Sequence, residues 1–147
     1  MIEPLPLEKL MEMWETDSEI DLTNMGEEVR KTARLHHRYL NQMYIYKEHL
    51  KFLEDEMSKL KLRKVKWIGR EVSEELWKEF GNPPTLPVPK TDYELYIRAD
   101  EKIIKLKNKI VNYQNAIDYL TDICKFVSQR NFLLKEYNTS RSLDEGK

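Results

Sequence analysis

The feature that most constrains the fold is a stretch from residue 27 to residue 68 that contains no Pro or Gly. Hydrophobic residues recur through it at intervals of three and four, the period of an amphipathic helix. The register runs through Val29, Thr32, His36, Tyr39, Met43, Tyr46, Leu50, Leu53, Met57, Leu60, Lys64 and Trp67. All but Thr32, His36 and Lys64 are apolar or aromatic. The pattern predicts one helix over residues 24–69, about 45 residues and roughly 65 Å long.

A second long helix is expected over residues 100–130, with Asp100 as its N-cap. Its seam contains no charged residue and runs through Ile103, Leu106, Ile110, Tyr113, Ile117, Leu120, Cys124 and Val127. Neighbouring apolar residues widen this face beyond a two-stranded seam, which suggests contact with more than one helix. We therefore expect the seam to be the oligomerisation surface. Asn131 marks an expected break, followed by a short helix and a tail over residues 131–147.

The remaining segments are shorter and more irregular. Residues 1–22 are acidic and contain one short amphipathic helix near Leu7–Trp14. Residues 70–98 are rich in Pro and Gly, with a short helix after Ser73 and an otherwise extended path. With 35% charged residues and only four Gly, the composition is typical of long helices that bury narrow stripes.

The sequence therefore predicts an all-α fold in a single helical domain over residues 1–147. Two long helices form an antiparallel, coiled-coil-like hairpin joined by a Pro-rich connection, with short helices at the termini. Thin apolar stripes need partners, so a homo-oligomer is expected.

Several classes of protein are disfavoured by the sequence. Cys124 is the single cysteine, which rules out an intramolecular disulfide and fits a reducing, intracellular compartment. No apolar run approaches the roughly 18 residues that span a bilayer, and the N-terminus does not resemble a signal peptide. Phosphate-binding loops and nucleophile motifs are missing, and His36, His37 and His49 are badly spaced for a metal. We expect no enzyme, no cofactor, no metal site and no membrane partner.

The strongest functional signal is the segment KLKLRKVKWIGR, residues 59–70. It contains six Lys or Arg and no Asp or Glu, although the whole chain has a net charge of -1. Like charges one turn apart destabilise a helix, and binding a polyanion is the usual compensation. The candidate DNA-binding residues are Lys59, Lys61, Arg63, Lys64, Lys66, Trp67 and Arg70. Because Lys64 interrupts the seam here, we expect this end of the helix to leave the bundle and enter solvent.

Trp67 favours an unpaired strand, because an aromatic ring among cations offers a stacking face for a base. The alternative is that Trp67 simply ends the hydrophobic seam. Two functions remain open on these residues. One is an oligomeric helical protein with a patch for single-stranded nucleic acid. The other is a non-catalytic coiled-coil structural or chaperone-like protein, in which the cations serve solubility only.

The basic segment also carries a family resemblance. Leu60–Arg70 reads LKLRKVKWIGR, close to the motif Leu-Lys-Ala-Arg-Leu-x-Tyr-Tyr-x-Gly-Arg. Ile20-Asp21-x-Thr23, Ala99-Asp100 and the ending Glu145-Gly146-Lys147 also match. In these motifs and their order the chain resembles the UvsY family, the recombination mediators of T-even-like phages, and is most similar to cyanophage members. It departs from the motif at Lys64, Lys66 and Trp67, which replace a Leu and two Tyr.

The resemblance implies a non-enzymatic mediator that assembles into a ring of about six or seven subunits, a closed symmetry usual for homo-oligomers. It implies single-stranded DNA binding, with the motif's Lys and Arg carried over onto Lys61 and Arg63. It also implies that the phage recombinase is loaded in place of the phage single-stranded-DNA-binding protein. The setting would be the cytoplasm of the infected bacterial host.

Overall fold

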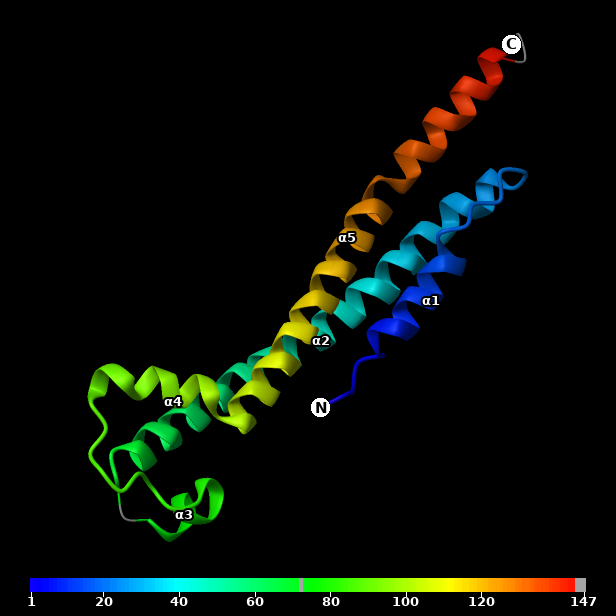
Figure 1. Cartoon of the computed structure of the whole chain (residues 1–147). Helices are drawn as coiled ribbons and strands as arrows, with labels where there is room; N and C mark the ends of the chain where they lie inside the picture. The colour runs from blue at the N-terminus through cyan, green and yellow to red at the C-terminus, as the bar shows by residue number, and fades with distance from the viewer. Residues whose placement is uncertain (72, 145–147) are drawn as a thin grey trace. The chain divides into compact units, whose positions relative to one another are not determined.

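The computed structural model describes residues 1–71 and 73–144, and every regular element among them is helical (Figure 1). The elements are α1 (Leu7–Asp17), α2 (Met25–Ile68), α3 (Glu74–Phe80), the 3-10 helix η1 (Lys90–Asp92), α4 (Tyr93–Ala99) and α5 (Glu101–Asp144). The all-α prediction is confirmed. The motif match at Glu145-Gly146-Lys147 lies outside the described residues.

The described chain divides into two compact units. The first holds Met1–Glu48 and the chain from Asn115 onward, and the second holds His49–Gln114. Both long helices contribute to each unit. The two units are described separately below.

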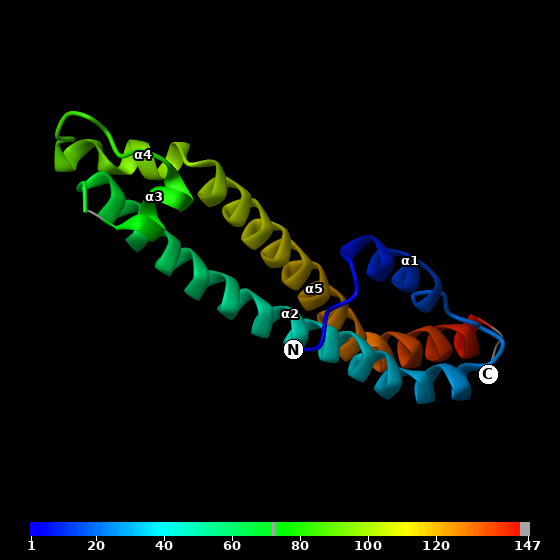
Figure 2. The ribbon, with the colours of Figure 1, turned by 90° about the horizontal axis from the view of Figure 1, so that it is seen from below.

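In the first unit, the beginning of α2 and the end of α5 lie side by side and run in opposite directions (Figures 1 and 2). Of the α2 residues predicted for the seam, Tyr39, Met43 and Tyr46 are buried here. Thr32 and His36 are partly buried, and Val29 is exposed. Leu120 and Val127 of α5 are fully buried in the same unit. The three-to-four spacing therefore identified the packing face of α2 from Tyr39 onward, but not at Val29, where the neighbouring Glu28 is buried instead.

The acidic N-terminal segment is fixed to this unit by specific contacts. Leu10 is fully buried, and the Trp14 ring packs edge-on against Tyr39 with 5.4 Å between ring centroids. Asp17 accepts hydrogen bonds from Arg38 at 2.6 Å and from the Tyr39 hydroxyl at 2.7 Å. Burial, together with the bond to Asp17, raises the pKa of Tyr39 far above its ordinary value. These contacts place α1 against the first part of α2 (Figure 1).

Helix α5 continues through Asn131 to Asp144, so the expected break at residue 131 is wrong. The reason is a buried polar cluster between α2 and α5. Arg130 donates to the carboxylate and backbone carbonyl of Glu28, and to Thr32 Oγ1 at 2.8 Å. Thr32 in turn donates to Asn131 Oδ1 at 2.7 Å. Thr32 and Asn131, the polar residues that interrupt the apolar pattern, are therefore hydrogen-bonded to each other across the two helices.

The second unit is built around the end of α2. Met57, Leu60, Trp67 and Ile68 form its core with residues from the later elements, namely Leu76, Ile97 and Ile103. The connection after Gly81 is less extended than predicted, because η1 and α4 occupy residues 90–99 and Ile97 enters the core. Asp100 caps α5 as expected, since its Oδ1 accepts from the Ile103 N–H at 3.0 Å.

Candidate nucleic-acid interface

The basic segment lies on the last turns of α2 and in the turn that follows, all within the second unit. Lys64, Trp67 and Ile68 are buried at 7%, 8% and 1% exposure. The expectation that this end of the helix leaves the bundle is therefore wrong. The later connection folds back over it and buries the interrupted part of the seam.

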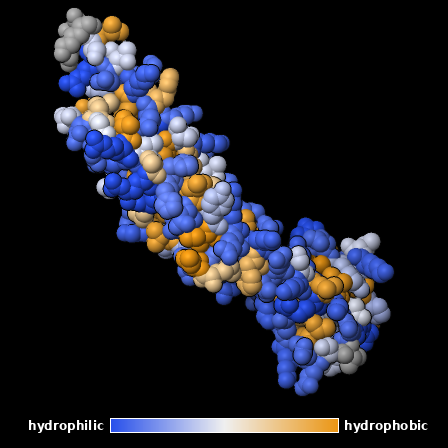
Figure 3. Space-filling model, turned by 180° about the vertical axis from the view of Figure 1, so that it is seen from behind, coloured by the Kyte–Doolittle hydropathy of each residue, from blue (hydrophilic) through white to orange (hydrophobic). Residues whose placement is uncertain are grey.

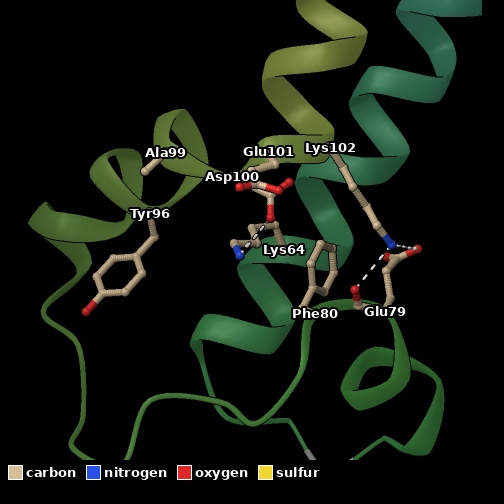
Figure 4. Close-up of a pocket in the computed structure, with 8 residues that line it drawn as sticks. All are labelled: Lys64, Glu79, Phe80, Tyr96, Ala99, Asp100, Glu101 and Lys102. Carbon is tan, nitrogen blue, oxygen red and sulfur yellow. Dashed lines mark hydrogen bonds and ion pairs between the residues drawn. The ribbon is translucent and has the colours of Figure 1, made fainter.

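Lys64 is enclosed by the Asp100 carboxylate and the rings of Trp67 and Phe80. Figure 4 shows Asp100 and Phe80 beside it. Its Nζ lies 3.0 Å from Asp100 Oδ2, 4.0 Å from the centroid of the Trp67 ring and 4.7 Å from that of Phe80. Burial alone would raise the pKa of Asp100, but the hydrogen bonds from Lys64 and the Ile103 N–H and the Lys64 charge outweigh it. The resulting pKa lies below the ordinary Asp value. In this arrangement Lys64 joins α2 to α3 and α5.

Trp67 belongs to the same cluster. Its indole N–H donates to the Gly81 carbonyl at 2.9 Å, and its ring lies 5.8 Å from that of Phe80. The ring that sequence analysis offered to a nucleic-acid base is therefore covered by the chain itself. Trp67 ends the hydrophobic seam, the alternative reading of this residue.

Arg63 is partly engaged. Its Nε donates to Glu79 Oε1 at 2.8 Å, and its side chain is 41% exposed. Lys102 approaches the same glutamate, with its Nζ 3.2 Å from the Glu79 backbone carbonyl. A guanidinium has five N–H donors, so the ends of the Arg63 side chain can still meet an anion while Nε stays bonded.

The other four cations, Lys59, Lys61, Lys66 and Arg70, are exposed. Lys59 lies 3.7 Å from Glu56, a surface contact of small energetic weight. The side chains of Lys61, Lys66 and Arg70 form no ion pair with the described residues. Of the seven candidates, these four are the exposed ones, and only Lys59 among them forms an ion pair with a described residue.

The four exposed cations do not form one patch. Residues seven apart on a helix lie within about 20° of one another, so Lys59 and Lys66 share a face. Lys61 lies about 200° around the helix from Lys59. The buried row of Met57, Lys64 and Ile68 runs beside Lys61, between Lys61 and the face that holds Lys59 and Lys66. The basic segment therefore presents charge in two directions.

Arg70 occupies an unusual backbone position, with a φ of 62°. The Arg70 N–H donates to the Trp67 carbonyl and the Glu71 N–H to the Lys66 carbonyl, which is the hydrogen-bond pattern of a Schellman C-cap. Gly is the usual residue at this position, because a side chain there costs roughly 1–2 kcal/mol. The preceding Gly69 does not have a positive φ.

The predicted oligomerisation residues divide by burial. Ile103, Leu120 and Val127 are buried within their own units, and Leu106, Ile110, Tyr113, Ile117 and Cys124 are partly buried. Burial raises the pKa of the Cys124 thiol. The C-terminal half of α5 has more exposed apolar residues than the N-terminal half, namely Phe126, Phe132, Leu133, Tyr137 and Leu143. Hydrophobic patches are also visible among hydrophilic ones in Figure 3.

Two other observations concern kinds of site. Among residues 1–71 and 73–144, no three His, Cys, Asp or Glu side chains are grouped so that they could hold a metal ion. No helix in the same ranges has the length and hydropathy needed to cross a membrane.

The chain was compared with known families and structures. A family model described as "Recombination, repair and ssDNA binding protein UvsY" matches residues 13–147. Crystal structures of the bacteriophage T4 recombination mediator protein UvsY in lattice types II, I and IV have similar folds, with TM-scores of 0.83, 0.81 and 0.82. In the same order, their sequence identities to this chain are 16%, 17% and 17%. The matches cover 96%, 92% and 95% of this chain, and 98%, 98% and 99% of the crystallised chains. No curated protein matches the chain.

Proposed function

The chain belongs to the UvsY family, and from that premise we propose that it is a non-catalytic recombination mediator whose main DNA contacts are the exposed cations at the end of α2. In this role it binds single-stranded DNA as an oligomer. It promotes loading of the phage recombinase in place of the phage single-stranded-DNA-binding protein. It acts in the cytoplasm of the infected bacterial host.

The observation that carries the proposal is the division of the basic segment. Lys64 and Trp67 serve the fold, whereas Lys59, Lys61, Lys66 and Arg70 remain exposed and have no strong internal partner. Each phosphate neutralised by such a cation releases condensed counterions, which makes binding favourable and dependent on salt.

Arg70 supports the same proposal independently. Gly at this left-handed position would be more stable, so the chain accepts backbone strain and carries a cation there. Strained residues of this kind concentrate at functional sites. Arg63 adds a partly engaged guanidinium to the same end of the helix.

The test is a fluorescence-anisotropy titration of labelled single-stranded and duplex oligonucleotides across salt concentrations. We expect the wild type to bind the single strand more tightly, with log Kd rising linearly with log salt. Binding that ignores salt would contradict the proposal and favour the second candidate, a coiled-coil structural or chaperone-like protein. Family membership and the strained Arg70 both favour the mediator over that candidate.

Assembly is proposed to use the exposed apolar surface of α5. Leu133 and Tyr137 follow Phe126 at seven and eleven residues, so the three form one row on the helix. Avidity in an oligomer can raise the affinity for a strand by orders of magnitude without any new contact. A buried seam residue such as Leu120 is already used within the subunit.

We predict that Leu133→Glu yields smaller species, because a charge cannot be buried against a second copy without a partner. Mass should be measured by light scattering, and helicity by circular dichroism should stay unchanged. The control is Ser128→Glu, which adds the same charge at an exposed position of the same helix, about 140° around it from Leu133. An unchanged mass for Leu133→Glu would place the assembly surface elsewhere.

A further inference from the structure

A groove of about 520 Å³ lies beside Lys61 in the second unit. It is bounded by the end of α2, by α4 and by the beginning of α5. Its apolar lining comes from Met57, Ile97, Ile103, Ile104 and Ile110, and its polar lining from Lys61, Glu94, Arg98, Lys107 and Asn108. The volume falls within the roughly 300–1,000 Å³ typical of small-ligand pockets.

The charge around this groove is positive. Lys61 and Lys107 are exposed, and neither forms an ion pair or side-chain hydrogen bond with the described residues. Among the described residues Arg98 pairs only with Glu94, with its Nε 3.5 Å from Glu94 Oε1 and both side chains more than half exposed. Three cations against one carboxylate leave two positive charges around an aliphatic floor.

The hollow shown in Figure 4 provides a contrast within the same unit. Its lining includes three carboxylates, those of Glu79, Asp100 and Glu101, against the two cations Lys64 and Lys102. Lys64 is already paired there with Asp100. An anion would be repelled from that hollow and attracted to the groove beside Lys61.

We infer that the groove beside Lys61 is a nucleotide subsite for single-stranded DNA, with phosphates at Lys61 and Lys107 and a base on the aliphatic floor. The inference rests on the proposed function and adds Lys107 and Arg98, residues outside the basic segment, to the DNA contacts. It also gives a role to Lys61, which points away from Lys59 and Lys66.

The chemistry of an unpaired strand matches the groove. A single strand alternates charged phosphates with bases whose faces are free, whereas a duplex keeps its bases stacked. The apolar floor removes a base face from water, and the cations take the flanking phosphates. Covered Trp67 cannot stack on a base, so the groove provides the apolar contact expected of that ring.

The first test is Lys107→Ala in the full chain, with a labelled oligothymidylate as the probe. Loss of one phosphate contact should lower the slope of log Kd against log salt by about 0.7. When salt is lowered from 1 M to 50 mM, the affinity of the variant should therefore rise about eightfold less than that of the wild type. The matched control is Lys105→Ala. Lys105 is exposed on the same helix but does not line the groove, so its slope should stay at the wild-type value.

The second test concerns the base. The wild type should bind oligothymidylate more tightly than an abasic strand of equal length, and Ile104→Asn should reduce that preference while sparing the salt slope. Ile104 is 43% exposed, so the substitution should leave the fold intact.

The outcomes separate the subsite from the proposed function. A wild type that fails to bind single strands overturns both. The subsite alone is overturned if Lys59→Ala with Lys66→Ala weakens binding while Lys107→Ala binds as the wild type does. The groove would then fit an acidic peptide with apolar side chains instead.

Discussion

Replacing Asp100 by Ala should lower the free energy of unfolding by about 3–5 kcal/mol, because it leaves Lys64 buried without its counter-ion. Lys64 has 8% of its side chain exposed and is covered by the rings of Trp67 and Phe80. The substitution also removes the carboxylate that accepts the Ile103 N–H at the start of α5. Loss of a cap typically adds about 1 kcal/mol.

Three companion variants separate these effects in urea unfolding at one protein concentration. Asp100→Asn keeps a capping oxygen and loses the charge, so it should cost less than Ala. Lys64→Met should also cost less, because Asp100 remains as a cap. Asp118→Ala is the control, since Asp118 is an exposed acid on the same helix. Equal losses for Asp100→Ala and Asp118→Ala would show that the buried pair does not stabilise the fold.

The pair of Lys64 and Asp100 should also make the free energy of unfolding depend on pH in the acidic range. The pKa of Asp100 is lower in the folded chain than in the unfolded chain, so the unfolded state takes up this proton first as the pH falls. The contribution is complete above the unfolded pKa of about 3.9 and is lost as the pH falls through the lower folded pKa. Asp100→Asn should flatten this part of the stability profile.

Replacing Glu28 by Ala should destabilise the protein by a similar amount, about 3–5 kcal/mol. Glu28 and Arg130 are 4% and 1% exposed, and the carboxylate is the ionic partner of Arg130. The Thr32 hydroxyl and the Glu28 backbone carbonyl would remain as acceptors, but neither carries a charge. An unpaired guanidinium would then be buried between α2 and α5.

The controls for this second cluster lie close by. Glu27→Ala removes the neighbouring acid, which is exposed and 3.6 Å from Arg30, and should change stability little. The double variant Glu28→Leu with Arg130→Met should recover most of the loss, because apolar residues of similar size often replace a buried pair without penalty. A Glu28→Ala protein as stable as Glu27→Ala would contradict a stabilising role for the cluster.

Much of the fold could be predicted from the sequence because its helices are long and periodic. Spacing alone located α2, and Asp100 marked the beginning of α5. The errors came where polar residues interrupt the pattern. Asn131 suggests a break locally, yet it accepts a hydrogen bond from Thr32, 99 residues earlier in the chain. No local signal reports such a partner.

The division of the basic segment into buried and exposed residues could not be predicted from the sequence. Lys64 and Trp67 look like DNA contacts because their partners lie 36 and 14 residues further along, at Asp100 and Gly81. The Pro-rich connection brings those partners back, and the sequence does not reveal its path. The proposed contacts Lys107 and Arg98 lie outside the basic segment in the sequence and meet Lys61 only through the fold, at the groove that all three line.

The most direct measurement is the salt dependence of single-stranded DNA binding by a variant with Lys59, Lys61, Lys66 and Arg70 all changed to Ala. Its charge-matched control changes Arg34, Lys51, Lys125 and Lys135, which are exposed outside the basic segment, to Ala. At about 0.7 for each phosphate contact, the fourfold variant should lose about 2.8 from the slope of log Kd against log salt. The control should keep nearly the wild-type slope, and both proteins should stay folded. Equal slopes for the two variants would contradict a DNA-binding role for the exposed cations of the basic segment.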